Sequence, residues 1–219
     1  MNTDWSGYAQ YHTSYYRPHK EQFRSFFQPL QHVRAPVDSA LEHLKGRGGD
    51  IVGFHIRRGD FGRLAFHLTP IQWYHRWLDE NWERLDRPSL FIATEDRSIV
   101  KEFKKWHPVT TESLGIELAT ARRNYNYLMH DIVEREPWQM DFFPDWWVLA
   151  QCDYLVISNS TFGFTAAMMN EDLKELWRSS LPHGYFEKID PWDSRPFRTE
   201  RVEDYPDLEG IRCEKNPYW

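Results

Sequence analysis

Two adjacent arginines, Arg57 and Arg58, follow a short apolar run, and hydroxyl side chains follow a second such run at 158–161. An arginine presents several N–H donors in a planar fork and stays charged. Ser160 and Thr161 stand where a helix is predicted to begin, and a helix N-terminus offers free N–H groups and a favourable dipole. These groups together suit a phosphate or diphosphate. We therefore predict an anion site.

Each of these features also has a purely structural explanation. The arginines could form surface ion pairs with Asp60 or Glu95, and Ser160 with Thr161 could be a plain helix cap. The chain has neither the G-x-x-x-x-G-K nor the G-x-G-x-x-G phosphate motif, so a kinase or a dehydrogenase loses its main support.

The elements that must position these residues alternate between strands and helices. Apolar runs predict buried strands at 51–56, 90–94 and 154–158, with a further strand at 175–177. Helices are predicted near 20–27, from Pro36 to about 45, and over 70–85, 97–106, 144–152 and 162–169. Alternation of this kind predicts an α/β fold with a parallel sheet that helices cover on both faces.

In such a sheet, ligands bind at the carboxyl ends of the strands. The first strand delivers His55 and the two arginines to this edge, and the second delivers Thr94, Glu95 and Asp96. The third strand ends at Ser158, directly before the predicted helix start. The candidate residues from three strands are therefore expected to meet at one edge.

Composition excludes several classes of protein. The 219 residues carry a net charge of −6 and show no basic face typical of nucleic-acid binding. No stretch of about 20 apolar residues predicts a membrane span, and no signal peptide is recognised, so a soluble cytoplasmic protein is expected. The Golgi lumen is the alternative if the chain was cut from a longer eukaryotic protein. Cys152 and Cys213 fit no metal spacing.

Four segments resemble one family of transferases. The segment Gly53–Asp60 (GFHIRRGD) resembles the H-x-R-R-x-D signature of the fucosyltransferases that use GDP-fucose, the superfamily of the α-1,2, α-1,6 and protein O-fucosyltransferases. The segments Ala65–His67 and Phe91–Asp96 are similar to the α-1,6 group, and Asp145–Phe164 is closest to the N-S-T-F form of the α-1,2 enzymes. The similarity runs from about Tyr16 to Met169, and the four motifs occur in the family's order.

The resemblance implies a Rossmann-like domain, the donor-binding half of a GT-B glycosyltransferase. It implies transfer of fucose from GDP-fucose to a glycan hydroxyl with inversion, without a metal or another cofactor. Carried over, Arg57 contacts the β-phosphate, Arg58 supports it or the sugar, and both stabilise the charge on the leaving diphosphate. His55 and Asp145 face the guanine. The remaining predicted donor-binding residues are Ser160 and Thr161 at the phosphates, with Asp60, Asp96 and Ser158.

The catalytic base has no direct counterpart in this sequence. The α-1,6 group has a glutamate after the signature, whereas the corresponding stretch here has Arg63 near that place. His67 and Asp60 are candidates by position only, and His67 could equally be a core histidine. Gly163 and the residues after it replace the tryptophans usual in the α-1,2 form, so acceptor contacts are expected to differ.

The resemblance divides the chain into three parts. Residues 1–49 are predicted to be a connector with helices, the remnant of an acceptor-binding side. Residues 50–180 are predicted to form the nucleotide-sugar-binding domain, and residues 181–219 a tail that packs on this domain. The N-terminal aromatics and the segment 110–140, with Tyr125 and Tyr127, are expected to supply the acceptor surface, since an acceptor domain is nearly absent. The alternatives are a nucleotide-sugar-binding module without transfer activity, a transferase for another nucleotide sugar, and a phosphate-handling hydrolase.

Overall fold

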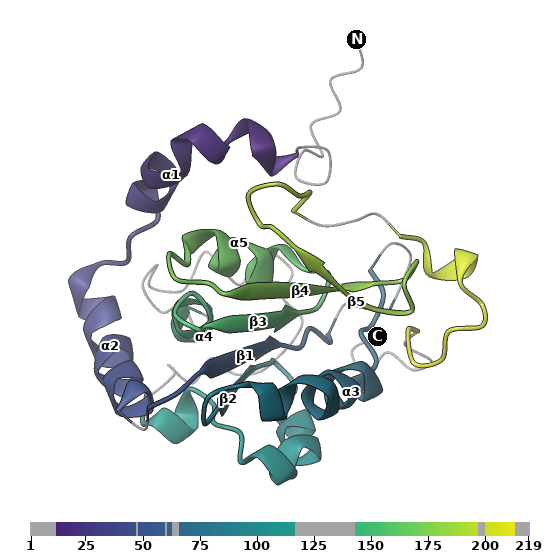
Figure 1. Ribbon diagram of the computed structural model, residues 1–219, viewed down its shortest axis with the longest axis horizontal. Helices are drawn as coiled ribbons and strands as arrows, with labels where there is room; N and C mark the ends of the chain where they lie inside the picture. The colour runs from purple at the N-terminus through teal and green to yellow at the C-terminus, as the bar shows by residue number, and fades with distance from the viewer. Residues whose placement is uncertain are drawn as a thin grey trace, which may run out of the picture.

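The protein is described by a computed structural model that covers residues 12–46, 48–59, 61–62, 66–116, 143–196 and 200–212. Its centre is one five-stranded sheet surrounded by helices (Figure 1). The strands lie in the order β2-β1-β3-β4-β5. They are β1 (Ile51–His55), β2 (Ser89–Ala93), β3 (Tyr154–Ile157), β4 (Glu175–Ser180) and β5 (Tyr185–Ile189).

The first four strands are parallel, and β5 pairs antiparallel with β4 at one end of the sheet. The α-helices of the described chain are α1 (Lys20–Phe26), α2 (Gln31–Lys45), α3 (Ile71–Asn81), α4 (Phe143–Leu149) and α5 (Thr161–Met169). The 3-10 helices are η1 (Thr13–Tyr15), η2 (Arg17–His19), η3 (Trp82–Arg84), η4 (Arg97–Trp106), η5 (Glu112–Leu114) and η7 (Val202–Asp204). This is the predicted α/β fold with a Rossmann-like arrangement.

Each face of the sheet packs against its own set of helices. Residues alternate along a strand, so Val52 and Phe54 of β1 point into a cluster with α3 and η4. Ile51 of the same strand points to the other face, into a cluster with α2, α4 and α5. Because both faces are covered, every residue of β1 is buried, which explains why its sequence is an unbroken apolar run up to His55.

Two predicted elements differ from the observed ones. Helix α2 begins at Gln31 and contains Pro36, whereas the sequence predicted Pro36 at its start. The stripe of Val37, Leu41 and Leu44 is buried, and this packing outweighs the hydrogen bond that a proline inside a helix removes. The segment Arg97–Trp106 forms a 3-10 helix, η4, with a kink at Phe103, rather than an α-helix.

The C-terminal segment holds more structure than the sequence pattern indicated. It contributes the edge strand β5 and the helix η7, neither of which was predicted. Val202 and Ile211 are buried with Leu181 in a small third cluster. The strand was missed because its sequence, YFEKI, mixes apolar and charged residues, and its pairing partner β4 is what makes it a strand.

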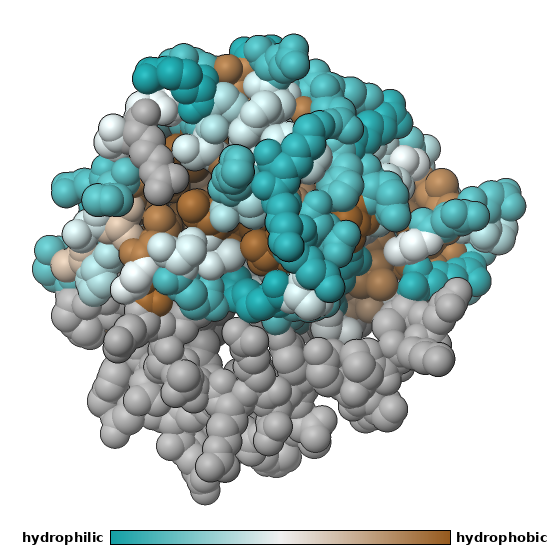
Figure 2. Space-filling model, turned by 90° about the horizontal axis from the view of Figure 1, so that it is seen from below, coloured by the Kyte–Doolittle hydropathy of each residue, from teal (hydrophilic) through white to brown (hydrophobic). Residues whose placement is uncertain are grey.

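In the view of Figure 2, the coloured part of the surface is mostly hydrophilic, with hydrophobic residues visible between the polar ones. In the part of the chain that the structure describes, no helix is both long enough and apolar enough to cross a membrane.

Candidate functional site

Three neighbouring strands end at the same edge of the sheet. His55, the last residue of β1, is in register with Ala93 of β2 and with Ile157 of β3. The segments that follow these strands therefore leave the sheet side by side, as the sequence predicted. The sequence patterns of 51–59, 89–96 and 154–161 thus bring the predicted donor-site residues together.

A buried hydroxyl pair fixes the exit of the chain from β1. The backbone N–H of Arg57 donates to Ser158 Oγ at 2.9 Å, and the hydroxyl of Tyr74 lies 3.0 Å from the same oxygen. The Tyr74 hydroxyl also donates to the carbonyl oxygen of His55 at 2.8 Å. The Ser158 hydroxyl thus forms hydrogen bonds with the backbone in this structure. Its contact with substrate stays a prediction. Tyr74 was missed as a site residue because it lies on the apolar face of α3.

Glu95 organises the turn that carries the two arginines. Its Oε1 accepts from the backbone N–H of Arg58 at 2.6 Å and lies 3.6 Å from Arg57 Nη1. Gly59 adopts φ +46° in this turn, a conformation that favours glycine. The alternative of an ion pair with Glu95 is therefore observed for Arg57. The Arg57 side chain nevertheless remains 37% exposed at the edge of the sheet.

The N-terminus of α5 lies at this edge too. Ser160 is its N-cap residue, and its Oγ accepts from the backbone N–H of Phe162 at 3.3 Å. Thr161 is the first residue of the helix. A Cβ at Gly163 would come within 2.8 Å of Ile157 Cγ2 and 3.0 Å of His55 Nδ1. Glycine here lets the first turn of α5 pack directly against the ends of β1 and β3.

His55 is a buried, neutral histidine. Burial, assisted by the charge of Arg57, lowers its pKa to about 3. Its ring lies 5.0 Å from the ring of Phe162, centroid to centroid, and its Nδ1 has no hydrogen-bond partner among the described residues. An unsatisfied buried nitrogen is uncommon in native proteins and is often found where a ligand binds.

Asp145 reaches the same edge from the first turn of α4. Its carboxylate accepts a hydrogen bond from the Thr111 hydroxyl, and Arg97 Nη2 lies 3.4 Å from Oδ2. Arg97 Nε also pairs with Glu112 Oε1 at 2.8 Å. Burial raises the pKa of Asp145 to about 6, although Arg97 and Thr111 act to lower it. Sequence reasoning missed Arg97, Thr111 and Glu112, because no local pattern marks them.

The other predicted residues lie as follows. Asp96 caps η4, where it accepts from the backbone N–H of Ser98 at 3.0 Å and from its hydroxyl at 2.6 Å. His67 is fully buried, with Nε2 3.0 Å from Ser179 Oγ, and burial lowers its pKa to about 4. This environment is that of a core histidine. The predictions on Asp60, Arg63, Tyr125, Tyr127 and Cys213 lie outside the described residues.

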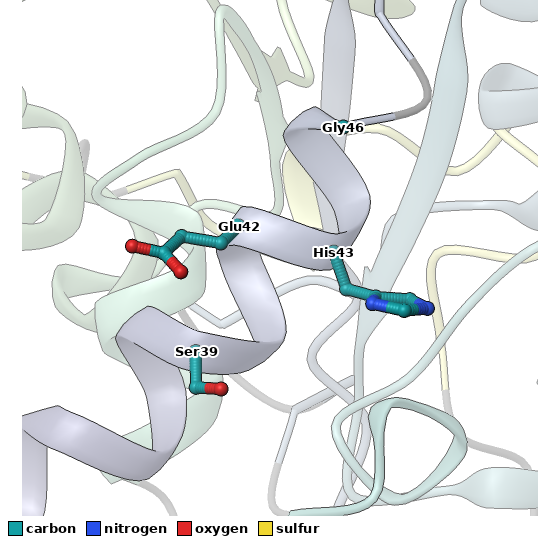
Figure 3. Close-up of a pocket in the computed structure, with 4 residues that line it drawn as sticks. All are labelled: Ser39, Glu42, His43 and Gly46. Atoms are coloured by element: carbon teal, nitrogen blue, oxygen red, sulfur yellow. The ribbon is translucent and has the colours of Figure 1, made fainter.

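A surface hollow of about 500 Å³ lies elsewhere, on α2, and is lined by Ser39, Glu42, His43 and Gly46. Figure 3 shows Glu42 and His43 extending to different sides of this helix. Helix α2 ends just before β1 begins, so Gly46 lies toward the opposite edge of the sheet. The hollow is therefore separate from the site. Within the described ranges, no group of three or more His, Cys, Asp or Glu residues could hold a metal ion.

Comparisons with known proteins point to one group of enzymes. The chain is 28% identical over 215 residues to galactoside alpha-(1,2)-fucosyltransferase 1 of Mico humeralifer, 29% identical to that of Lagothrix lagotricha, and 28% identical to that of Saimiri sciureus. Each match covers 91% of this chain and 50% of the relative, so the chain spans about half the length of these curated relatives.

No protein-family model matches the chain, and no solved structure does. The similarity to the curated relatives nevertheless covers 91% of the chain. It agrees with the resemblance read from the motifs: the chain is similar to proteins named as fucosyltransferases.

Proposed function

We propose that this protein is a glycosyltransferase that binds GDP-fucose at the carboxyl edge of its sheet and transfers fucose to a glycan hydroxyl. The observation that carries the proposal is the meeting of Arg57, the N-terminus of α5 and the Asp145 carboxylate at that edge. A cationic fork and a helix N-terminus suit a diphosphate. A buried carboxylate suits the N–H donors of a purine base.

In the proposed reaction, the bond between the anomeric carbon and the diphosphate oxygen breaks, and the electron pair stays on the diphosphate. Arg57 and the free N–H groups of α5 bind the negative charge that develops there, and Arg58 supports them. The acceptor oxygen forms the new bond from the opposite side of the sugar, so the configuration inverts. Its proton passes to a general base. In this scheme no metal and no cofactor is needed.

The geometry around Arg57 fits a role in phosphate binding. Glu95 holds the Arg58 backbone and lies beside the guanidinium, so the side chain is oriented before a ligand arrives. Preorganised donors gain more from a developing charge than donors that must first reorient. The hydrogen bonds of the Ser158 and Tyr74 hydroxyls also hold the backbone in place where this turn begins.

The wider setting follows from the resemblance and is part of the proposal. The two facing domains of a GT-B enzyme, with a short acceptor side, stay an inference from the family. The relatives' name states that they act on galactosides, so a galactoside is the first acceptor to test. The compartment, cytoplasm or Golgi lumen, stays a prediction.

Calorimetric titration tests the donor site. We expect the protein to bind GDP and GDP-fucose, to prefer them to UDP, and to do so equally with and without a chelator. Arg57→Ala should weaken this binding strongly, whereas Arg76→Ala should retain it, because Arg76 pairs with Glu80 on the exposed side of α3. A preference for UDP, or a requirement for a divalent ion, would contradict the proposed donor or mechanism.

Turnover separates the enzyme from the alternatives. Release of GDP from GDP-fucose that depends on a galactoside acceptor indicates a transferase. Binding of the donor without any turnover indicates a nucleotide-sugar-binding module. Release of inorganic phosphate without an acceptor indicates a hydrolase.

A further inference from the structure

Arg97 occupies an unusual place for a charged residue. It is the first residue of η4, which follows β2 after a three-residue connection, and its side chain is 20% exposed. Its Nε pairs with Glu112 and its Nη2 lies 3.4 Å from Asp145 Oδ2, while Nη1 is buried with no hydrogen-bond partner among the described residues. A buried ion pair with an unsatisfied nitrogen adds little to stability. Such an arrangement is typical of a functional site.

The Asp145 carboxylate depends on this arginine for its charge. Burial raises the pKa of Asp145, and Glu112 acts in the same direction, whereas Arg97 and the Thr111 hydroxyl act against them. Among the described residues, Arg97 supplies the positive charge that lies within hydrogen-bonding distance of the carboxylate. Without Arg97, the pKa of Asp145 would rise further, and the neutral carboxylic acid would remain the favoured form up to a higher pH.

The other elements packed against α4 do not replace Arg97. On α2, Arg34 pairs with Asp38 at 2.6 Å, and Asp38 accepts from the indole N–H of Trp147. Strand β1 brings His55, whose lowered pKa keeps it neutral. Strand β2 and helix α5 carry no charged side chains. Burial has the largest effect on the pKa of Asp145, and among the charged groups of the described residues Arg97 has the largest opposing effect.

We propose that Arg97 is a positioning residue that keeps the Asp145 carboxylate ionised and oriented to accept two N–H donors from the guanine edge of the donor nucleotide. This inference rests on the proposed function. A carboxylate is an acceptor only, whereas a protonated carboxyl group presents one O–H donor in place of an acceptor. Guanine offers its N1–H and its amino group side by side, so it needs both acceptor oxygens. Arg97 thereby sets both the affinity for guanine and the pH range of binding.

The test is the dissociation constant of GDP-fucose as a function of pH from 5 to 8. GDP-fucose is the suitable probe, because the terminal phosphate of GDP itself titrates at a pH of about 6, as phosphate monoesters do. For the wild type we expect binding to weaken below the pKa of Asp145, which is about 6. Arg97→Met should move this midpoint upward by about 1–3 pH units, so that binding at pH 7 is weaker than that of the wild type and increases toward pH 8.

Three further variants make the test specific. Arg97→Lys keeps a positive charge and should keep a midpoint near that of the wild type. Asp145→Asn should bind weakly with no midpoint in this range, because it cannot ionise. Arg76→Met removes an exposed arginine and should leave the profile unchanged.

The possible results are distinguishable. A midpoint that stays in place while Arg97→Met weakens binding equally at every pH would overturn the inference, because it would show a structural role only. Unchanged binding would overturn it as well. If the wild type binds no GDP-fucose at any pH, the proposed function itself fails. If Arg97→Met does not fold, Thr111→Val serves instead, since loss of its hydrogen bond to Asp145 should raise the midpoint by a smaller amount.

Discussion

The two edges of the sheet use charged residues in different ways. At the amino edge, Lys174 Nζ lies 2.5 Å from Asp50 Oδ1 and 3.1 Å from Asp153 Oδ1. The second oxygen of Asp50 accepts from the backbone N–H of Asp86, and that of Asp153 accepts from Ile51, each at 2.9 Å. The hydrogen bonds from Lys174 to the two carboxylates raise its pKa. Each charge here has partners, and the cluster ties the starts of β1, β3 and β4 together.

At the carboxyl edge the charged and titratable groups are less completely paired. Within the described residues, His55 Nδ1 and Arg97 Nη1 are buried without hydrogen-bond partners. Burial lowers the pKa of His55 and raises that of Asp145, so both are pushed toward their neutral forms. Polar groups that form hydrogen bonds with one another stabilise the fold. Buried polar groups without partners can instead form favourable hydrogen bonds with a ligand. The comparison therefore supports a structural role for the amino edge and favours the carboxyl edge as the proposed ligand site.

The largest effect is expected from Arg57→Ala. Loss of a charge-assisted donor to the β-phosphate should weaken GDP-fucose binding about 10- to 100-fold. Loss of the same donor from the leaving group should slow transfer about 100- to 1000-fold. The measurements are calorimetry and the initial rate of GDP release. A variant that keeps its transfer rate would remove the carboxyl edge as the place of chemistry.

The variant Arg97→Met should give the next effect on function. At pH 7 it should lower affinity about 2-fold for a midpoint shift of one unit, about 10-fold for two units and about 100-fold for three, because affinity follows the ionised fraction of Asp145. Its affinity should recover toward pH 8, which Arg57→Ala cannot do. The ratio of the two affinities at pH 8 and pH 7 is the quantity to compare.

Acid should destabilise the fold through its buried histidines. His55 and His67 have pKa values of about 3 and about 4 in the folded protein, below the ordinary value of 6.5. The unfolded chain therefore binds more protons between pH 6.5 and pH 4, and stability falls as pH falls through this range. Lowering the pH from 7 to 5 should cost about 2 kcal/mol for each histidine.

Urea unfolding at pH 7 and pH 5 measures this effect. His67→Gln should reduce the difference between the two free energies of unfolding. Asp145 contributes in the opposite sense, because its folded pKa is raised, so the part of the curve between pH 6 and pH 4 should be shallower than two histidines alone predict. An equal stability at both pH values would show that the histidines are accessible to protons in the folded state.

A substitution at the amino edge is expected to change the stability of the fold and not the binding of GDP-fucose. Lys174→Met leaves Asp50 and Asp153 facing each other without their shared cation. Because Lys174 is half exposed, the cost is limited to about 1–2 kcal/mol. Urea unfolding measures it, and calorimetry should find the affinity for GDP-fucose unchanged. Weaker nucleotide binding in this variant would break the proposed separation of the two edges.

The smallest effect is expected from Tyr74→Phe. The change removes one buried hydroxyl that donates to His55 and contacts Ser158. The free energy of unfolding should fall by about 1 kcal/mol. Affinity for GDP-fucose should fall only slightly, because Ser158 still accepts from the Arg57 backbone. A large loss of affinity would instead show that Tyr74 is needed to place the arginine turn.

Several features could be predicted because they depend on local sequence. The apolar run before Arg57 predicted β1, and the buried pattern of that strand confirms it. Ser160 was recognised as a helix start because a serine cap acts within a few residues of itself. Pro36 misled the prediction, since its usual place at a helix start was overridden by burial of the residues that follow it. Strand β5 was missed because its partner decides its conformation.

The sequence by itself determined the fold class, the order of the strands along the chain and the motif residues at their ends. Periodic burial, helix caps and the arginine pair all act over a few residues, so one sequence is enough to read them. Only the tertiary structure decided that Arg97 and Thr111 contact Asp145. The two residues lie 48 and 34 positions away from Asp145 in the chain. It also decided the protonation states of His55 and Asp145, because desolvation depends on what packs around a group and not on its neighbours in sequence.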